Sequence, residues 1–542
     1  MSPQDDQASR DATVGRRAFL QLGTALGAAL VLTPPASATP IGAGHTRARN
    51  SRTFQASFEL DEATVGQLQE AMESGKHTAR SLAEQYLRRV DEVDANGPAL
   101  HAIIERNPDA LTIADTLDAE RRAHGSRGPL HGIPVLIKDN IDTADKMKTS
   151  AGSLALAESV AQQDASLVGR LRQAGAVVLG KTNLSEWANF RSTHSTSGWS
   201  GRGGLTRNPY ALDRNPCGSS SGSAAAVSAN LAAIAVGTET DGSIVCPSSA
   251  CGVVGIKPTI GLISGAGIIP ISRSQDTAGP IARTVTDATL LLGVLAGKDY
   301  SSALDPAGLK GARIGVARNF FGFNGQVDRL MDEALRAMRE AGAVLVDPAN
   351  LSTPKQLDDA EQEVLLYEFK TGLNAYLAGL GPEAPAKSLA ALIAFNDQHR
   401  DREMPFFGQE LFLQAQAKGR LTDPAYAQAL ATCRRLSRAE GIDSVLRKHR
   451  LTAIVAPTGG PAWVTDLLNG DHFTGGSSSL PAVAGYPAIT VPAGFVSGLP
   501  VGITFMGVAR GEWSLIKLAY AFERTTKLRR KPEFLPTAEL QS

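Results

Sequence analysis

Apolar side chains recur at helical spacing in the part of the chain that follows residue 60. The positions three and four residues apart are Leu82, Tyr86, Val90 and Val93. This spacing places them on one face of a helix. Thr78 stands just before them and is a residue type that favours the first, capping position of a helix. The pattern predicts helical structure from Thr64 to about Glu120.

From Gly132 onward the pattern changes to short β-branched runs bounded by Gly and Pro. Such runs are typical of buried strands. They are Ile133–Ile137, Ala176–Leu179, Ala453–Val455 and Ile489–Val491. Helical stretches separate them, and alternating strands and helices predict a three-layer α/β core. Residues 325–448 are charged and mostly helical, so we expect an insertion or a cap there, with the sheet pattern returning only after residue 451.

An arginine pair and an apolar run stand at the start of the chain. Arg16 and Arg17 precede the run Ala18–Leu32, and residues 36–38, Ala-Ser-Ala, offer a cleavage site of small residues. The run is shorter than the ~20 residues that span a bilayer. We therefore expect a twin-arginine (Tat) export signal over residues 1–38, a loose segment over 39–60, and a periplasmic or secreted protein. A cytoplasmic protein with an amphipathic start is the alternative.

Composition narrows the classes of function. The 542 residues include 54 Lys+Arg and 54 Asp+Glu, so the formal net charge is zero. A nucleic-acid-binding protein would carry a basic surface, and 5% aromatic residues are too few for a base-stacking platform. The hydrophobic fraction of 43% excludes a mainly disordered chain. We expect a globular enzyme or binding protein with no nucleic-acid partner and no stable membrane association after removal of the signal.

Cysteines are too sparse for a disulfide scaffold. The four are Cys217, Cys246, Cys251 and Cys433, and no histidine lies at zinc-binding spacing from them. A Tat substrate folds before export, in a reducing compartment. We therefore expect buried thiols, a fold that does not depend on disulfides, and no metal site.

Two common motifs match the sequence but stand in the wrong context. Gly175–Thr182 fits the phosphate-binding loop G-x-x-x-x-G-K-[ST], yet its middle is strand-like, and Gly175 is better explained as the residue that ends a helix. Gly218–Gly222 fits the G-x-S-x-G elbow of α/β-hydrolases. That elbow requires a preceding strand, whereas a turn, Asn215–Cys217, precedes it here. An esterase of the α/β-hydrolase type stays only as an alternative.

A third group of segments indicates nucleophilic catalysis. Lys138 ends the apolar run Ile133–Ile137, so burial should lower its pKa and leave a neutral amine that can accept a proton. A serine cluster follows in NPCGSSSGSAAAVSAN, and Ser243 ends the Gly/Thr/Asp-containing turn Val236–Ser243. Successive backbone N–H groups in such a turn can converge on an anion. Together these segments form a candidate catalytic site.

In this order the segments resemble the amidase signature family, from about Thr64 to the C-terminal region. The matching motifs are GIPVLIKD, GAVVLGKTNLSEW, the serine cluster, DGSI, GVVGIKPT and QDTAGPIARTVTDA. The resemblance implies an α/β fold, a three-layer α/β/α arrangement with a large mixed central sheet flanked by helices. It implies a single domain over residues 61–530, with a signature core at about 126–300 and a C-terminal part at 451–530. It implies no metal and no organic cofactor.

The resemblance also implies a Ser-Ser-Lys triad. Ser243 is the expected nucleophile, Ser219 the bridging serine in a cis configuration, and Lys138 the base. The adjacent Ser220 is expected to contact the substrate. The N–H groups expected to form the oxyanion hole are those of Thr240, Asp241, Gly242 and Ser243.

The surroundings of Ser243 depart from the common family pattern T-D-T-G-G-S-I-R. Asp241 replaces a glycine and Val245 replaces an arginine, so the local charge differs. Within the family, NPCGSSSGSAAAVSAN and TETDGSIVCP are most similar to bacterial peptide amidases, which remove the C-terminal amide of peptides.

We therefore expect a monomeric serine amidohydrolase that converts carboxamides, foremost the C-terminal amide of peptides, to carboxylate and ammonia. Three alternatives stay open beside the esterase. They are an amidase for other small, aryl or fatty amides, a non-enzymatic exported binding protein, and a subunit of a tRNA-dependent amidotransferase. The export signal and the zero net charge oppose the amidotransferase subunit.

Overall fold

The computed structural model describes residues 57–352, 355–381 and 384–540, and the predicted export signal lies outside them. The first described elements are helices α1 (Val65–Glu73), α2 (Ala79–Arg89) and α3 (Ala110–His124). Thr78 is the N-cap of α2, as predicted, because its side chain accepts a hydrogen bond from the Ser81 N–H at 3.1 Å. A short strand, β1 (Ile103–Arg106), interrupts the region that was predicted to be helical throughout.

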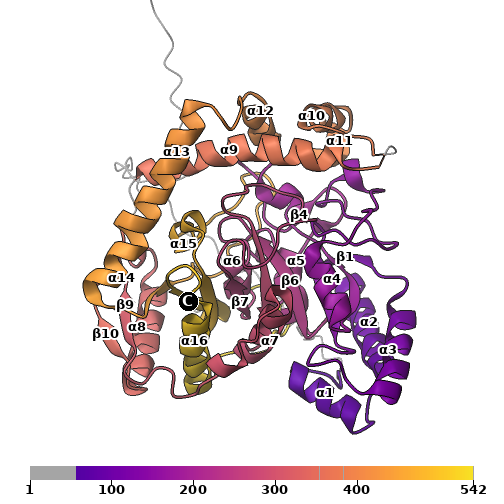
Figure 1. Cartoon of the computed structure of the whole chain (residues 1–542), viewed down its shortest axis with the longest axis horizontal. Helices are drawn as coiled ribbons and strands as arrows, with labels where there is room; N and C mark the ends of the chain where they lie inside the picture. Colours follow the sequence, from indigo (N-terminus) through magenta and orange to yellow (C-terminus); the bar gives the residue numbers. More distant parts are fainter. Residues whose placement is uncertain (1–56, 353–354, 382–383, 541–542) are drawn as a thin grey trace, which may run out of the picture. The chain divides into compact units, whose positions relative to one another are not determined.

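A mixed sheet of eleven strands runs through the described residues (Figure 1). Its order is β1, β3 (Val177–Thr182), β2 (Pro134–Lys138), β6 (Ile234–Glu239), β8 (Thr277–Ala282), β7 (Val254–Lys257), β12 (Ala488–Val496), β13 (Leu499–Met506), β11 (Ala453–Pro457), β9 (Arg313–Val316) and β10 (Val344–Val346). Strand β2 pairs in parallel with β3 and β6, whereas β6 pairs antiparallel with β8. The α/β class and the large mixed sheet are confirmed, and β2, β3, β11 and β12 are the four predicted strands.

Helices cover the sheet and bury its apolar strands. Helices α4 (Ser166–Gln173), α7 (Val285–Ala296), α16 (Glu512–Thr526) and α8 (Gly325–Glu340) contact one another in that order. Helix α5 (Ser221–Ser228) is buried along its whole length. In its first turn only glycine fits at position 222, because a Cβ there would lie only 2.3 Å from the Asn183 carbonyl oxygen. This close approach sets the end of α5 against the segment that follows β3.

A second group of helices forms the expected cap, but its bounds differ from the prediction. Helix α9 (Lys355–Ala378) crosses the top of the view in Figure 1, with α10 (Leu389–Gln398), α11 (Arg400–Glu403) and α12 (Glu410–Gln416) beside it and α13 (Pro424–Arg434) descending from it. Residues 325–346 belong instead to the core, because α8 packs on β12 and β10 pairs with β9. The sheet therefore resumes before residue 451. Strands β9 and β10 are too short to show a clear pattern in the sequence.

The expectation of buried thiols is wrong for two of the four cysteines. Cys217 and Cys246 form a disulfide across a sequence separation of 29 residues, while Cys251 and Cys433 are free and buried. The fold brings the first two together because Cys217 leads into α5 and Cys246 lies in α6 (Val245–Ala250), and these helices contact each other.

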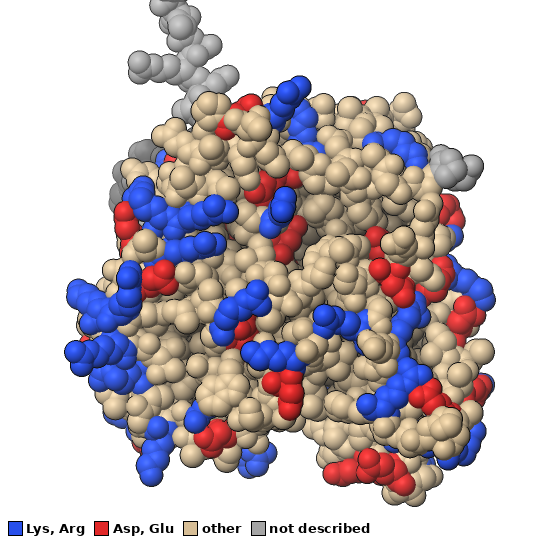
Figure 2. Space-filling view, in the orientation of Figure 1, with Lys and Arg blue, Asp and Glu red and all other residues tan. Residues whose placement is uncertain are grey.

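The face of the molecule shown in Figure 2 carries both charges, with Asp and Glu side chains interspersed among the Lys and Arg side chains. In the described ranges, no helix has the length and apolar composition needed to cross a bilayer.

Candidate active site

Lys138 is the last residue of β2 and is fully buried. Its Nζ lies 2.8 Å from Thr238 Oγ1, 3.2 Å from the Thr238 carbonyl oxygen and 2.7 Å from Ser219 Oγ. Burial lowers the pKa of Lys138 to about 7, although the charges of Asp276 and Glu239 act in the opposite direction. A neutral amine has two N–H donors and one lone pair. The two Thr238 oxygens match the donors, and the Ser219 hydroxyl matches the lone pair.

Ser219 and Ser243 lie on two neighbouring segments. Ser219 is buried in the turn before α5, and Ser243 lies in the turn between β6 and α6. The Ser219 N–H donates to Ser243 Oγ at 3.2 Å, and the Ser220 N–H donates to the Ser243 carbonyl oxygen at 3.2 Å. Within the described part of the chain, the two hydroxyl groups are not hydrogen bonded to each other. The structure therefore brings Lys138, Ser219 and Ser243 into one contiguous group.

Access to this group is from the side of Ser243. Its exposed fraction is 8%, whereas Lys138 and Ser219 are completely buried. A ligand that enters the site therefore meets the Ser243 hydroxyl before it meets the lysine.

Residues 240–243 form a turn whose backbone N–H groups are free to bind a ligand. The N–H groups of Thr240, Asp241, Gly242 and Ser243 donate no hydrogen bond to any residue that the structure describes. Gly242 has φ +77°, a conformation that favours glycine, and a Cβ there would lie 3.0 Å from Ser478 Oγ. Such a run of unpaired N–H groups beside a hydroxyl can accommodate a negatively charged oxygen.

Three polar side chains that the sequence analysis did not single out hold this turn. Glu239 accepts hydrogen bonds from the Ile244 and Val245 N–H groups at 2.7 and 3.0 Å. Asp276 accepts from Thr240 Oγ1 at 2.7 Å, and Ser478 donates to Asp241 Oδ1 at 2.6 Å. The last two come from distant parts of the sequence, so only the fold reveals their proximity.

Two expectations for the serine cluster need correction. Ser220 is completely buried, donates to the Thr238 carbonyl oxygen at 3.0 Å and accepts from the Thr238 N–H at 3.1 Å. It therefore ties α5 to β6 and does not face a substrate. The peptide bonds on both sides of Ser219 are trans, because the one cis bond among the described residues is Asp347–Pro348.

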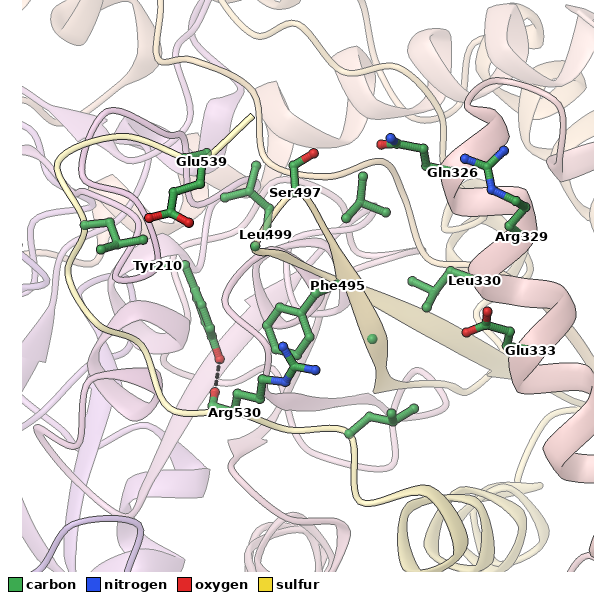
Figure 3. Close-up of a pocket in the computed structure, with 16 residues that line it drawn as sticks. Tyr210, Gln326, Arg329, Leu330, Glu333, Phe495, Ser497, Leu499, Arg530 and Glu539 are labelled. Atoms are coloured by element: carbon green, nitrogen blue, oxygen red, sulfur yellow. Dashed lines mark hydrogen bonds between the residues drawn. The ribbon is translucent and has the colours of Figure 1, made fainter. Parts of the chain in front are cut away.

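A separate cavity of about 580 Å³ lies between α8, the turn joining β12 to β13, and the C-terminal segment. Figure 3 shows Tyr210, Arg329, Phe495 and Arg530 around it. Lys138, Ser219 and Ser243 do not line this cavity, so it is distinct from the site described above. Among the described residues, no cluster of three or more His, Cys, Asp or Glu side chains could hold a metal ion.

Comparisons with known proteins agree with the geometry. The family model described as Amidase matches residues 81–516. A probable amidase of Arabidopsis thaliana is 42% identical over 509 residues, covering 89% of this chain and 93% of that protein. The crystal structure of native peptide amidase from Stenotrophomonas maltophilia is 52% identical, with a TM-score of 0.84, over 88% of this chain and 100% of that one. A structure of peptide amidase with the competitive inhibitor chymostatin has the same identity and coverage and a TM-score of 0.85. The chain belongs to the amidase signature family and is an amide-hydrolysing enzyme.

Proposed function

We propose that this enzyme hydrolyses the C-terminal carboxamide of peptides through an acyl intermediate on Ser243. The observation that carries the proposed roles is the environment of Lys138. Its amine is completely buried, has a pKa of about 7, and lies 2.7 Å from the Ser219 hydroxyl. A lysine that is neutral near pH 7 can act as a general base, which an exposed lysine cannot do.

In the first half of the reaction, Ser243 Oγ attacks the carbonyl carbon of the substrate. The Ser243 proton passes to Ser219 Oγ while the Ser219 proton passes to Lys138 Nζ. This transfer requires the Ser243 O–H to point toward the Ser219 hydroxyl, while Ser243 Oγ can keep accepting a hydrogen bond from the Ser219 N–H at 3.2 Å. A serine can bridge the two groups because its hydroxyl donates and accepts at the same time.

The carbonyl oxygen becomes negatively charged in the tetrahedral intermediate. The backbone N–H groups of residues 240–243 are the proposed donors to that oxygen. Removing one such donor in other enzymes costs about 3–4 kcal/mol of transition-state stabilisation. The C–N bond then breaks as the amide nitrogen accepts the proton that Lys138 returns through Ser219, and the nitrogen leaves as ammonia. Water then attacks the acyl group along the same path, and the carboxylate is released.

The preference for peptide amides rests on the likeness to peptide amidase and on the loop between β11 and α15 (Ser479–Ala484). This loop joins the site through the Ser478–Asp241 hydrogen bond. It also exposes the apolar side chains Val464, Leu468 and Phe473. We expect these side chains to contact the acyl part of an extended peptide. Burial of one such side chain contributes about 1.5–3 kcal/mol, so selectivity among peptides should be modest.

Mass spectrometry of an amidated pentapeptide after incubation with the purified enzyme tests the proposal. The expected product has a C-terminal carboxylate in place of the carboxamide, with internal peptide bonds and side-chain amides intact. A panel of fatty, aryl and small aliphatic amides run in parallel separates the alternatives. Rapid turnover of a fatty or aryl amide without reaction of the peptide amide would assign the enzyme to another substrate class.

A further inference from the structure

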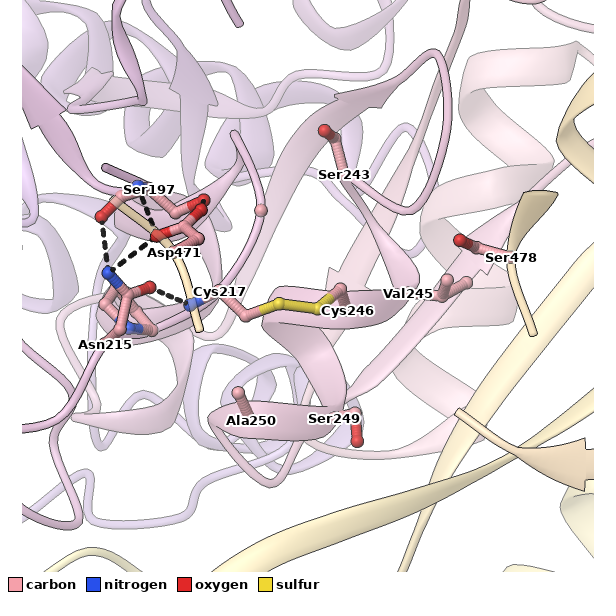
Figure 4. The surroundings of a disulfide bond; sticks show 12 residues. Ser197, Asn215, Cys217, Ser243, Val245, Cys246, Ser249, Ala250, Asp471 and Ser478 are labelled. Carbon is pink, nitrogen blue, oxygen red and sulfur yellow. Dashed lines mark hydrogen bonds between the residues drawn. A yellow bond between two sulfur atoms is a disulfide. The ribbon is translucent and has the colours of Figure 1, made fainter. Parts of the chain in front are cut away.

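The disulfide Cys217–Cys246 lies directly beside the two proposed catalytic serines. Cys217 precedes Ser219 by two positions, and Cys246 follows Ser243 by three. The bond holds the Cα atoms of the two cysteines 5.7 Å apart. Figure 4 shows it joining the segment that leads into α5 to helix α6, next to the turn that carries Ser243. It is therefore a covalent link between the segment of the bridging serine and the segment of the nucleophile.

Few other bonds connect these two segments at the level of the serines. They are the Ser219 N–H to Ser243 Oγ bond and the Ser220 N–H to Ser243 carbonyl bond, both 3.2 Å long. The segments also touch, since a Cβ at Gly218 would lie 2.8 Å from Pro247 Cδ. The Ser219 N–H to Ser243 Oγ bond involves the reacting oxygen itself. The disulfide is a covalent link and involves no reacting atom.

The backbone before Ser219 also depends on side-chain anchors. Cys217 has φ +63° and Gly218 has φ +61°, and the left-handed region is uncommon for a residue other than glycine. Two anchors hold Cys217 in this conformation. Its N–H donates to Asn215 Oδ1 at 2.7 Å, and its side chain is bound to Cys246. Loss of the disulfide removes one of these anchors directly upstream of Ser219.

We propose that Cys217 and Cys246 are positioning residues whose disulfide works as a redox latch on the catalytic serines. With the bond formed, the segments before α5 and α6 hold Ser219 and Ser243 at a fixed spacing. With the bond reduced, the fold stays, because α5 and β6 are buried in the core, but the two serines lose their fixed spacing. This inference rests on the proposed roles of Ser219 and Ser243.

The exchange is accessible from Cys246, which is half-buried, whereas Cys217 is buried. A thiolate of a dithiol reductant attacks Sγ of Cys246 and displaces the Cys217 thiolate, which takes up a proton. The second thiol of the reductant then displaces Cys246, so the reductant becomes a cyclic disulfide and two electrons and two protons reach the protein. Glutathione disulfide reverses the change through the same kind of mixed disulfide.

The test compares the oxidised enzyme with enzyme treated with dithiothreitol, using hydrolysis of a peptide amide as the assay and a thiol titration to confirm reduction. Because a misplacement of about 1 Å in an active site can cost on the order of 100-fold, we expect kcat to fall at least tenfold with little change in KM. The melting temperature should change far less than the activity, and glutathione disulfide should restore kcat.

Matched variants identify the responsible thiols. The double variant Cys217→Ser/Cys246→Ser should have a low kcat that no longer responds to dithiothreitol. Cys251→Ala and Cys433→Ala each remove a buried free thiol and should keep the full response. An unchanged kcat after complete reduction, or a loss of activity that parallels unfolding, would overturn the latch. Failure of the oxidised enzyme to hydrolyse any carboxamide would instead overturn the proposed function.

Discussion

Two opposing electrostatic effects act on Lys138. Burial disfavours its charged form, and the carboxylates of Asp276 and Glu239 favour it. Burial is the larger effect, so the pKa falls to about 7 from the ~10.4 of a free lysine. Above pH 7 the amine is mainly neutral and able to accept a proton, and below pH 7 it is increasingly an ammonium group that cannot.

The pH dependence of activity follows from the lowered pKa of Lys138. We expect kcat/KM for a peptide amide to rise with pH through about 7 and then to level off. Below that range, kcat/KM should fall about tenfold for each pH unit, because one proton inactivates the base. A pH–rate profile of the free enzyme measures this directly. An acid limb near pH 4, where carboxylates titrate, would assign the base to a different residue.

Removal of the Ser243 hydroxyl should stop turnover without disturbing the fold. Its Oγ accepts one hydrogen bond of 3.2 Å, from the Ser219 N–H. We therefore expect Ser243→Ala to keep the melting temperature and to lose at least about 10⁴-fold in kcat, since no neighbouring group can form the acyl intermediate. Lys138→Ala should be nearly as inactive. Substantial residual turnover by Ser243→Ala, measured as ammonia release, would exclude Ser243 as the nucleophile.

At the scale of the element, the passage from the turn after β6 into α6 depends on the buried carboxylate of Glu239. Glu239 Oε2 accepts from both the Ile244 and the Val245 N–H groups, which open α6. Without it, two buried donors next to the nucleophile lose their acceptor. The free-energy cost of one such unsatisfied group is about 1–3 kcal/mol.

Glu239→Ala should therefore lower the free energy of unfolding by about 2–6 kcal/mol and reduce kcat as well. Glu239→Gln keeps an oxygen in the same position and should lose less stability. Thermal or denaturant unfolding of the three proteins measures the difference. If the alanine variant unfolds like the parent and hydrolyses amides at the same rate, Glu239 does not hold the turn.

Elements with a strong local pattern could be predicted from the sequence. Strands β2 and β11 are short apolar runs buried along their whole length, and Gly175 ends α4 with φ +77°, as predicted. Strand β6 was not predicted, and its second half was assigned to the turn Val236–Ser243, because residues 237–239, Gly-Thr-Glu, have the composition of a turn. Pairing with residues 277–279 of β8 makes them a strand. Long-range pairing of this kind leaves no local signal.

Part of the candidate site could likewise be predicted from the sequence, and part could not. Lys138, Ser219 and Ser243 could be predicted because their side-chain chemistry suits catalysis and their motifs occur in the order typical of the family. The contact between Asp241 and Ser478 and the disulfide joining Cys217 to Cys246 depend on which segments meet in space. The buried position of Ser220 depends on the packing of α5 against β6, which the motif does not encode.

At the scale of the whole molecule, the fold and the proposed redox latch depend on different interactions. The eleven-stranded sheet and its buried helices supply the fold, whereas the disulfide links two segments near the serines. A chain built in this way can fold in a reducing compartment and acquire its disulfide later. This order of events suits the Tat pathway, which exports folded proteins, and we propose that the Arg16-Arg17 segment directs the chain to it.

The double variant Arg16→Lys/Arg17→Lys tests the export proposal in a bacterial host with a Tat pathway. We expect the variant to stay in the cytoplasm, and Arg47→Lys/Arg49→Lys, which lies beyond the predicted cleavage site, to be exported like the parent. Enzyme recovered from the cytoplasm under thiol-blocking conditions should contain reduced Cys217 and Cys246, because glutathione and thioredoxin keep cytosolic thiols reduced. Unblocked enzyme should gain peptide-amide hydrolysis on treatment with glutathione disulfide. If the Arg16/Arg17 variant shows unchanged activity outside the cytoplasm, the Tat signal is contradicted. If the retained, reduced enzyme is fully active, the latch is contradicted while the amidase assignment stays intact.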